Sequence, residues 1–141
     1  MLFSPRKTKF RKWQTGRKHP RRLNAPETRG ITVAFGSFGL KAQTPARVTA
    51  NQLEAARKVI VRTIGKTGKL WIRVFTDRPI TQKAAEVGMG KGKGDVDHYV
   101  SEVRPGRVIF EVEASSEEVA REALRKAAMK LPMKAKVVAR K

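Results

Sequence analysis

The sequence predicts an α+β fold, a two-layer α/β sandwich in which two helices pack on a mixed, mostly antiparallel sheet, preceded by an extended basic N-terminal arm. Three observations predict it. Short β-branched or alternating segments recur through the chain, two stretches with helical apolar spacing interrupt them, and positive charge crowds into the first thirty residues. We expect residues 1–30 to form the arm and residues 31–141 a globular body with a long loop at about residues 76–97.

The body is expected to begin with two strands. Residues 31–35 alternate and are β-branched, which is typical of a strand, and Gly36 and Ser37 interrupt them. Residues 38–42 form a second candidate strand, weakened by Gly39.

A helix comes after these strands. Thr49 and Gln52 fit a T-x-x-Q capping box, which marks a helix start. Its apolar face is built from Leu53, Ala56, Ile60 and Ile64, and Gly65 or Gly68 is expected to end it.

Residues 70–75 predict the next strand, whose Trp71, Ile72, Val74 and Phe75 we expect to pack against Leu53 and Ile60. If burial alternates, Trp71 and Arg73 share one face, which must then be open to solvent or a partner and makes Trp71 a candidate contact as well.

The second half predicts a hairpin, a helix and a last strand. Residues 98–103 and 108–113 are expected to pair through a turn at residues 104–107. A helix over about residues 116–131 is expected to start with a capping box of Ser115 and Glu118 and to stop at Pro132. Residues 136–139 form a short final strand.

Charge indicates the class of partner. Thirty-two Lys and Arg against twelve Asp and Glu give a formal net charge of +20. Self-repulsion on that scale favours a polyanionic partner, with nucleic acid the first candidate and an anionic membrane the second. The chain has no cysteine, and its two histidines, His19 and His98, are far apart, so we expect no metal and no cofactor.

The arm is the leading candidate for nucleic-acid binding. Lys and Arg neutralise phosphates, and aromatic rings between them can stack on bases. The candidate residues are Arg6, Lys7, Lys9, Phe10, Arg11, Lys12, Trp13, Arg17, Lys18, Arg21 and Arg22. A solvated tail and an organellar transit peptide are the alternatives.

The loop at residues 76–97 contains a glycine-rich run, residues 88–94. It fits neither a P-loop, because Lys93 is followed by Gly94 rather than Ser or Thr, nor a dinucleotide fingerprint. A mobile finger on a phosphate backbone and a plain surface loop remain equal readings. Asp95 and Asp97 lack a completing third ligand, so we expect solvated charge there, and no catalytic residues.

Several long motifs resemble those of the bacterial large-subunit ribosomal protein numbered sixteen, a universal family. They are residues 5–12 with 16–17 in the arm, 35–40, 68–75 with 77–79, 89–94 and 130–132. The resemblance implies an RNA-binding structural protein, not an enzyme, in cytoplasmic ribosomes, with organellar ribosomes also open.

The resemblance also implies partners. They are large-subunit ribosomal RNA near the central protuberance, tRNA in the A site with the P site as a further candidate, and neighbouring ribosomal proteins, without a membrane or small-molecule substrate. It implies a contribution to the aminoacyl-tRNA site and to subunit assembly. The expected RNA- and tRNA-facing residues of the loop are Arg78, Lys83, Met89, Gly90, Lys91, Gly92 and Lys93.

The chain departs from this family in two places. Gly88 stands where many members carry Arg, and residues 19–29 form a longer junction between arm and body. A free nucleic-acid chaperone and an RNA-processing enzyme are the other functional classes, and the second lacks an evident catalytic constellation.

Overall fold

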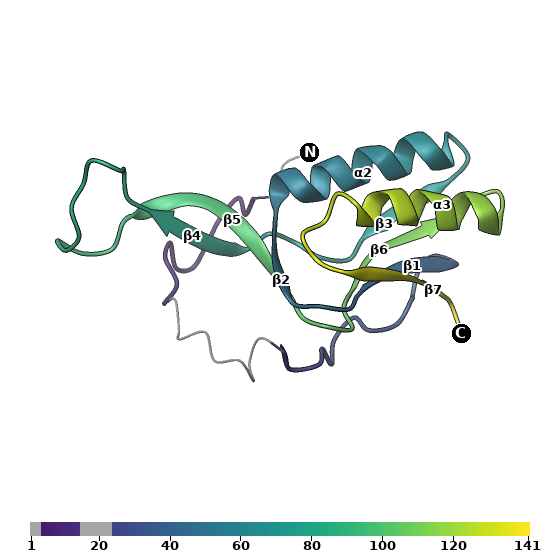
Figure 1. The fold of residues 1–141 in the computed structure, drawn as a ribbon, viewed down its shortest axis with the longest axis horizontal. Helices are drawn as coiled ribbons and strands as arrows, with labels where there is room; N and C mark the ends of the chain where they lie inside the picture. Colours follow the sequence, from purple (N-terminus) through teal and green to yellow (C-terminus); the bar gives the residue numbers. More distant parts are fainter. Residues whose placement is uncertain (1–3, 15–23) are drawn as a thin grey trace.

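The computed structural model describes residues 4–14 and 24–141, which form two antiparallel sheets and two long helices (Figure 1). This confirms the predicted α+β class. The expected mixture of strand directions is absent from the described residues, because every strand pairing there is antiparallel.

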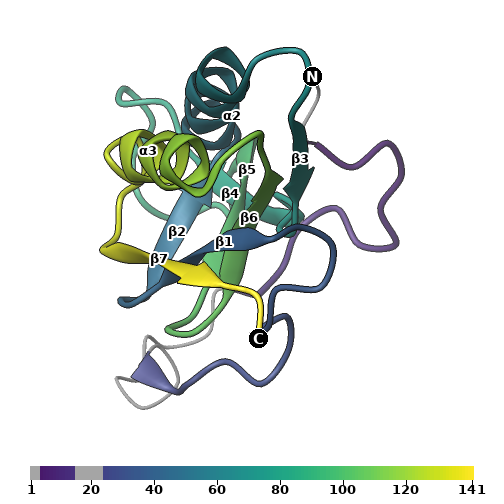
Figure 2. The same ribbon diagram turned by 90° about the vertical axis from the view of Figure 1, so that its right-hand side faces the viewer.

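The larger sheet has the strand order β3-β6-β1-β7. Its strands are β1 (Phe38–Ala42), β3 (Lys69–Ile72), β6 (Val108–Glu113) and β7 (Ala135–Ala139). The helices α2 (Ala50–Ile64) and α3 (Glu117–Ala128) lie side by side on one face of it, as Figure 2 shows. Between these layers lies the apolar core, which includes Leu40, Leu53, Ile60, Phe110 and Leu124, none with any exposed surface.

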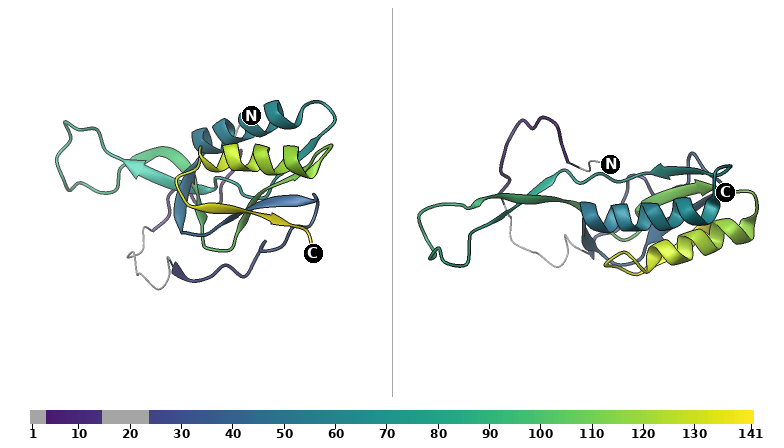
Figure 3. Two further views of the ribbon diagram at one scale, coloured as in Figure 1. Left: turned by 45° about the vertical axis from the view of Figure 1, so that its right-hand side comes forward. Right: turned by 90° about the horizontal axis from the view of Figure 1, so that it is seen from above.

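The smaller sheet has the order β2-β5-β4, with β2 at Ala46–Thr49, β4 at Arg78–Gln82 and β5 at Asp95–Val103. Strands β4 and β5 form a hairpin that projects away from the helices and carries residues 83–94 at its tip (Figures 1 and 3). The predicted loop at residues 76–97 is therefore shorter than expected. Pro79 and the polar residues around it show no strand pattern, and the short β2 was not predicted.

Local capping explains where the helices begin. The capping box of Thr49 and Gln52 is present, and α2 ends at Gly65, as predicted. For α3 the predicted box was wrong by one residue: Ser116 is the N-cap, and its hydroxyl accepts a hydrogen bond from the backbone N–H of Val119 (3.3 Å). The helix also ends at Ala128, earlier than expected.

The predicted hairpin of residues 98–113 is wrong. β5 belongs to the smaller sheet and β6 to the larger one, so the turn at residues 104–107 carries the chain between sheets. The segment from β1 to β2 also passes between the two sheets, and it lies beside the turn at residues 104–107. The N–H of Ala42 donates to the carbonyl of Arg107 (2.9 Å), and the N–H of Gly106 donates to the carbonyl of Ala42 (2.8 Å). These bonds fasten the two sheets together at their junction.

Strand β3 stops at Ile72, earlier than predicted, and this changes the packing of residues 73–75. Val74 is buried in the core and Ile72 packs against it, as expected, whereas Phe75 is 46% exposed and Trp71 is half-buried. The prediction that Phe75 packs in the core is therefore wrong.

Residues 31–37 are not a strand, although residues 31–35 were predicted to be one. We call residues 31–37 the cover segment, because they lie across the face of the larger sheet opposite the helices. Their backbone groups bond to β6 and its side chains: the N–H of Ser37 donates to the carbonyl of Val112 (3.1 Å), and three others reach Glu111.

Candidate nucleic-acid interface

The arm and the β4–β5 hairpin, predicted as separate RNA-binding elements, lie together. The Nζ of Lys93 donates to the carbonyl of Trp13, and the Nζ of Lys12 donates to the carbonyl of Lys93 (3.3 Å). Lys12 also forms an ion pair with Asp95 (3.7 Å). Residues 12–14 of the arm thus contact the hairpin, while the segment before them arches away from it (Figure 3, right).

Arg78 fixes this contact from the base of the hairpin. Its guanidinium carbon lies 5.6 Å from the ring centroid of Trp13, its Nη2 donates to the carbonyl of Gln14 (3.4 Å), and it forms an ion pair with Glu102 (3.2 Å). Arg78 is buried, so it positions the arm instead of presenting an open cation. A cation–π contact and an ion pair at a partly dry site are each stronger than in open water.

The arm presents its other cations to solvent. Arg6, Lys7, Lys9 and Arg11 are exposed, and no residue from 4 to 14 is acidic. Phe10 is 64% exposed, with the Nζ of Lys9 at 5.5 Å from its ring centroid. The predicted arm residues Arg17, Lys18, Arg21 and Arg22 lie outside the described residues.

The hairpin tip owes its shape to left-handed backbone. Gly90, Lys91 and Gly92 have φ values of 98°, 58° and 91°, a run that glycine makes accessible on either side of Lys91. The Nζ of Lys83 donates to the carbonyl of Gly90 and closes the tip, while Met89 is fully exposed and Lys91 is exposed. Of the predicted loop residues, Lys83 and Lys93 are therefore engaged internally, and Met89 and Lys91 project outward.

A cleft of about 590 Å³ separates the arm from the junction of the two sheets. It carries mixed charge. Its lining includes Trp13, Arg73, Phe75, Arg78, Glu102 and Arg107. The guanidinium of Arg107 already has partners within the protein, because it donates hydrogen bonds to the carbonyls of Arg29 (3.1 Å) and Arg73 (3.0 Å).

Several acidic side chains outside the arm and hairpin pair with nearby cations. On α3, Glu117 pairs with Arg121 (2.7 Å) and Glu122 with Arg125 (2.8 Å). The hydrogen bond from Arg125 and the neighbouring positive charges lower the pKa of Glu122 to about 2. These pairs neutralise cations on the helical layer, in contrast to residues 4–14 of the arm, which contain no acid.

A second exposed feature lies over the larger sheet, and sequence reasoning found only part of it. One row across the sheet contains Trp71, Glu111 and Gly39, which are register partners on β3, β6 and β1. The cover segment meets each of them. A Cβ on Gly39 would lie 2.8 Å from a methyl group of Val33, so only glycine admits that side chain.

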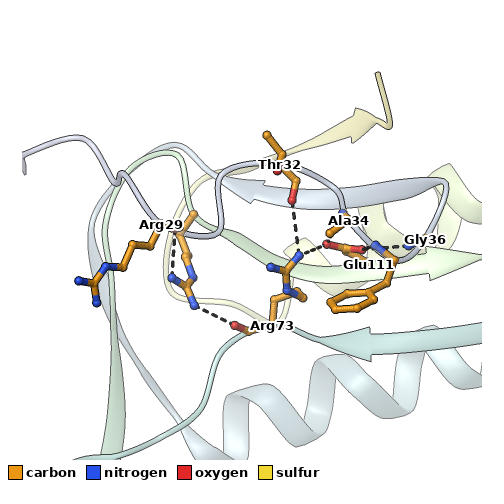
Figure 4. Close-up of polar contacts among 8 residues, drawn as sticks. Arg29, Thr32, Ala34, Gly36, Arg73 and Glu111 are labelled. Carbon is orange, nitrogen blue, oxygen red and sulfur yellow. Dashed lines mark hydrogen bonds and ion pairs between the residues drawn. The ribbon is translucent and has the colours of Figure 1, made fainter.

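Glu111 is the centre of this row and has no exposed surface. Its carboxylate accepts backbone N–H bonds from Ala34 (3.0 Å), Phe35 (2.6 Å) and Gly36 (2.9 Å) and pairs with Arg73 (Figure 4). Burial acts to raise the pKa of Glu111, but these four donors together outweigh it and lower the pKa from its usual value. The one acid within the apolar run of β6 was the sequence signal for this site.

Phe35 completes the row. Its ring stacks on Trp71 with centroids 6.3 Å apart and 19° between planes, and the Arg73 guanidinium carbon lies 5.0 Å from its centroid. The expectation that Trp71 and Arg73 share a face is thus confirmed.

The described residues offer neither a metal cluster nor a membrane span. Within residues 4–14 and 24–141, no group of three or more His, Asp or Glu side chains is placed to hold a metal ion. No helix in this part of the chain is long and apolar enough to cross a bilayer.

A basic α+β body joined to a strongly basic arm is the architecture of a nucleic-acid-associated protein. The family model described as "Ribosomal protein L16p/L10e" matches residues 5–138, and the chain belongs to this family. It is therefore a ribosomal protein, a structural component and not an enzyme, which confirms the resemblance seen in its motifs.

Curated relatives extend this match along the chain. The large ribosomal subunit protein uL16 of Halorhodospira halophila is 53% identical over 139 residues, covering 99% of this chain and 98% of the relative. The proteins of the same name from Psychrobacter cryohalolentis and Cereibacter sphaeroides are 52% and 50% identical over the same lengths.

Proposed function

We propose that this chain is a structural constituent of the large ribosomal subunit in the cytoplasm, where it binds large-subunit ribosomal RNA near the central protuberance. Residues 1–30 act as the RNA-binding arm and residues 31–141 as the positioned body. The protein contributes to the aminoacyl-tRNA site, contacts tRNA in the A site with the P site as a second candidate, and supports subunit assembly and translation.

One observation carries the proposal: the arm and the glycine-rich hairpin meet on one side of the molecule. The Lys93–Trp13, Lys12–Lys93 and Arg78–Gln14 contacts join them. Two elements that each offer cations to a phosphate backbone thus lie close enough to engage a single RNA, on which they neutralise more phosphates together than either does alone.

The hairpin tip supports the tRNA part of the proposal. It projects well beyond the body (Figure 1) and offers Met89 and Lys91 at its end. Its backbone is held by Lys83 and by left-handed turns. A slender, internally braced tip can enter a crowded ribonucleoprotein site that the body itself cannot reach.

The test compares two variants of equal charge loss. In the arm variant Arg6, Lys7, Lys9 and Arg11 become alanine. In the control Lys130, Lys134, Lys136 and Arg140, exposed residues near β7, become alanine. Each full-length protein is bound to large subunits salt-washed free of this protein, over a series of salt concentrations.

The arm variant is expected to bind more weakly than the control, and its log affinity should depend less steeply on log salt, by about 0.7 to 0.9 per lost phosphate contact. Equal affinities and equal slopes for the two variants would contradict an arm-led interface. Binding of the wild-type protein to free DNA in preference to the washed subunits would favour a nucleic-acid chaperone instead.

A further inference from the structure

We propose that Phe35 is a stacking platform for one unpaired nucleobase of ribosomal RNA, at a site separate from the arm and the hairpin tip. This inference rests on the proposed function, since it names a second contact with the same partner. The geometry of the cover segment carries it.

The ring of Phe35 is fixed in place, although it is 56% exposed. The N–H of Phe35 itself and those of both neighbours donate to buried Glu111. Gly36 adds a close approach, because a Cβ there would lie 2.6 Å from the backbone carbonyl of Val112. A buried carboxylate and a required glycine therefore hold in position a side chain that gains little burial from folding.

Part of the ring is covered by neighbouring side chains, and the 56% of Phe35 that stays exposed is open to a ligand. Trp71 stacks on the ring and Arg73 lies against it. Arg73 is in turn held by Glu111 and by the carbonyl of Thr32 (3.5 Å), as Figure 4 shows. A nucleobase can stack on an aromatic ring, and a guanidinium plane beside that ring favours the stack.

A hollow of about 440 Å³ adjoins the ring. Its lining includes Phe35, Arg57, Val61, Leu70, Trp71 and Arg73. The hollow is open and partly apolar, as a base-binding surface requires, and Val61 contributes a side chain that is 42% exposed.

Charge selects RNA over an apolar protein segment as the occupant. Residues 50–68, which include α2, contain the basic residues Arg57, Lys58, Arg62 and Lys66, and their one acid, Glu54, is bound by Arg57 at 2.9 and 2.6 Å. The cover segment contains no acid. A nucleotide brings a phosphate that this surplus attracts, whereas an apolar peptide gains nothing from it.

The experiment rebuilds large subunits that have been salt-washed free of this protein, using full-length Phe35→Ala, Phe35→Leu, Phe35→Trp and wild-type chains. Met129→Ala removes another exposed apolar side chain, at the end of α3, and serves as the matched control. Affinity is measured by sedimentation, RNA mobility by 2′-hydroxyl acylation, and folding of each variant by urea unfolding.

Phe35→Ala is expected to weaken binding by about 5- to 150-fold, the range for loss of one base stack, and to raise the acylation of one or a few unpaired nucleotides. Phe35→Leu should resemble Phe35→Ala because it lacks a π-face, while Phe35→Trp and Met129→Ala should resemble wild type.

Two results would overturn the platform and leave the proposed function intact. One is wild-type affinity and acylation for Phe35→Ala. The other is wild-type affinity and acylation for Phe35→Leu, which would indicate an apolar protein contact. Failure of the wild-type chain to join the washed subunits would instead overturn the proposed function itself.

Discussion

Replacing Glu111 with glutamine tests how the cover segment is held on the sheet. The substitution keeps the shape of the side chain but removes its charge, and it turns one acceptor oxygen into an N–H₂ donor. That donor must face N–H groups of residues 34–36 or the guanidinium of Arg73. At least one buried donor then loses its acceptor, and Arg73 loses its counter-ion.

The magnitude of the loss depends on this geometry. Removing one partner of a buried ion pair destabilises a protein by about 3–5 kcal/mol, and hydrogen bonds to charged groups contribute about 1.5–3 kcal/mol each. Glu111 has no exposed surface, while the side chain of Arg73 is 21% exposed, so water can partly solvate the freed arginine. We therefore expect a loss of about 3–4 kcal/mol in the free energy of unfolding.

Urea unfolding followed by circular dichroism measures this loss. If the free energy of unfolding falls by about 1.5 kcal/mol per molar urea, the urea concentration at the unfolding midpoint should drop by roughly 2–3 M. Glu113→Gln, an exposed position on the same strand, is the control and should stay within about 0.5 kcal/mol of wild type. A loss below about 1 kcal/mol for Glu111→Gln would refute the view that this carboxylate organises the segment.

Three other predictions concern the same architecture. Folding lowers the pKa of Glu111, so its stabilisation is complete above the unfolded pKa of about 4.3 and is lost as pH falls through the folded value. The stabilities of wild type and Glu111→Gln should therefore start to converge as pH falls below about 4. Gly36→Ala should cost about 1–3 kcal/mol in urea unfolding, since its Cβ would meet the carbonyl of Val112, whereas Gly88→Ala, with nothing within 4 Å, should change stability by less than about 0.5 kcal/mol; equal effects would contradict the close approach. Deleting residues 1–22 should preserve the circular-dichroism spectrum and lower both RNA affinity and its salt dependence, and a lost spectrum or full affinity would contradict the division into arm and body.

Local signals predicted the helices well. Thr49 and Gln52 act on each other three residues apart, so the start of α2 was readable from the sequence. For α3, two adjacent serines offered two registers, and Ser116 rather than Ser115 caps the helix. The predicted apolar face of α2 was also correct, because helical periodicity is a property of neighbouring residues.

Sheet membership was not readable in the same way. Residues 31–35 have the composition of a strand, yet the N–H groups of residues 34–36 bond to Glu111, more than seventy positions away. Residues 98–113 have the pattern of a hairpin, but β6 pairs with β1 and β3 instead of β5. Long-range pairing outweighs local propensity in such cases.

The candidate site divides along the same line. The basic arm and the glycine-rich tip were evident from composition, since charge and glycine are local. Their contact through Trp13, Lys93 and Arg78 was not predicted, because it joins residues 64 to 80 positions apart. The burial of Arg78, which converts an expected RNA-facing cation into a support for the arm, results from that contact.

Sedimentation of a cell lysate tests the central claim most directly. The lysate is separated on a sucrose gradient at moderate salt, and the protein is quantified by mass spectrometry against other large-subunit proteins. The account predicts near-stoichiometric amounts in large subunits and whole ribosomes. A mainly free pool, or one that follows chromosomal DNA, would contradict it.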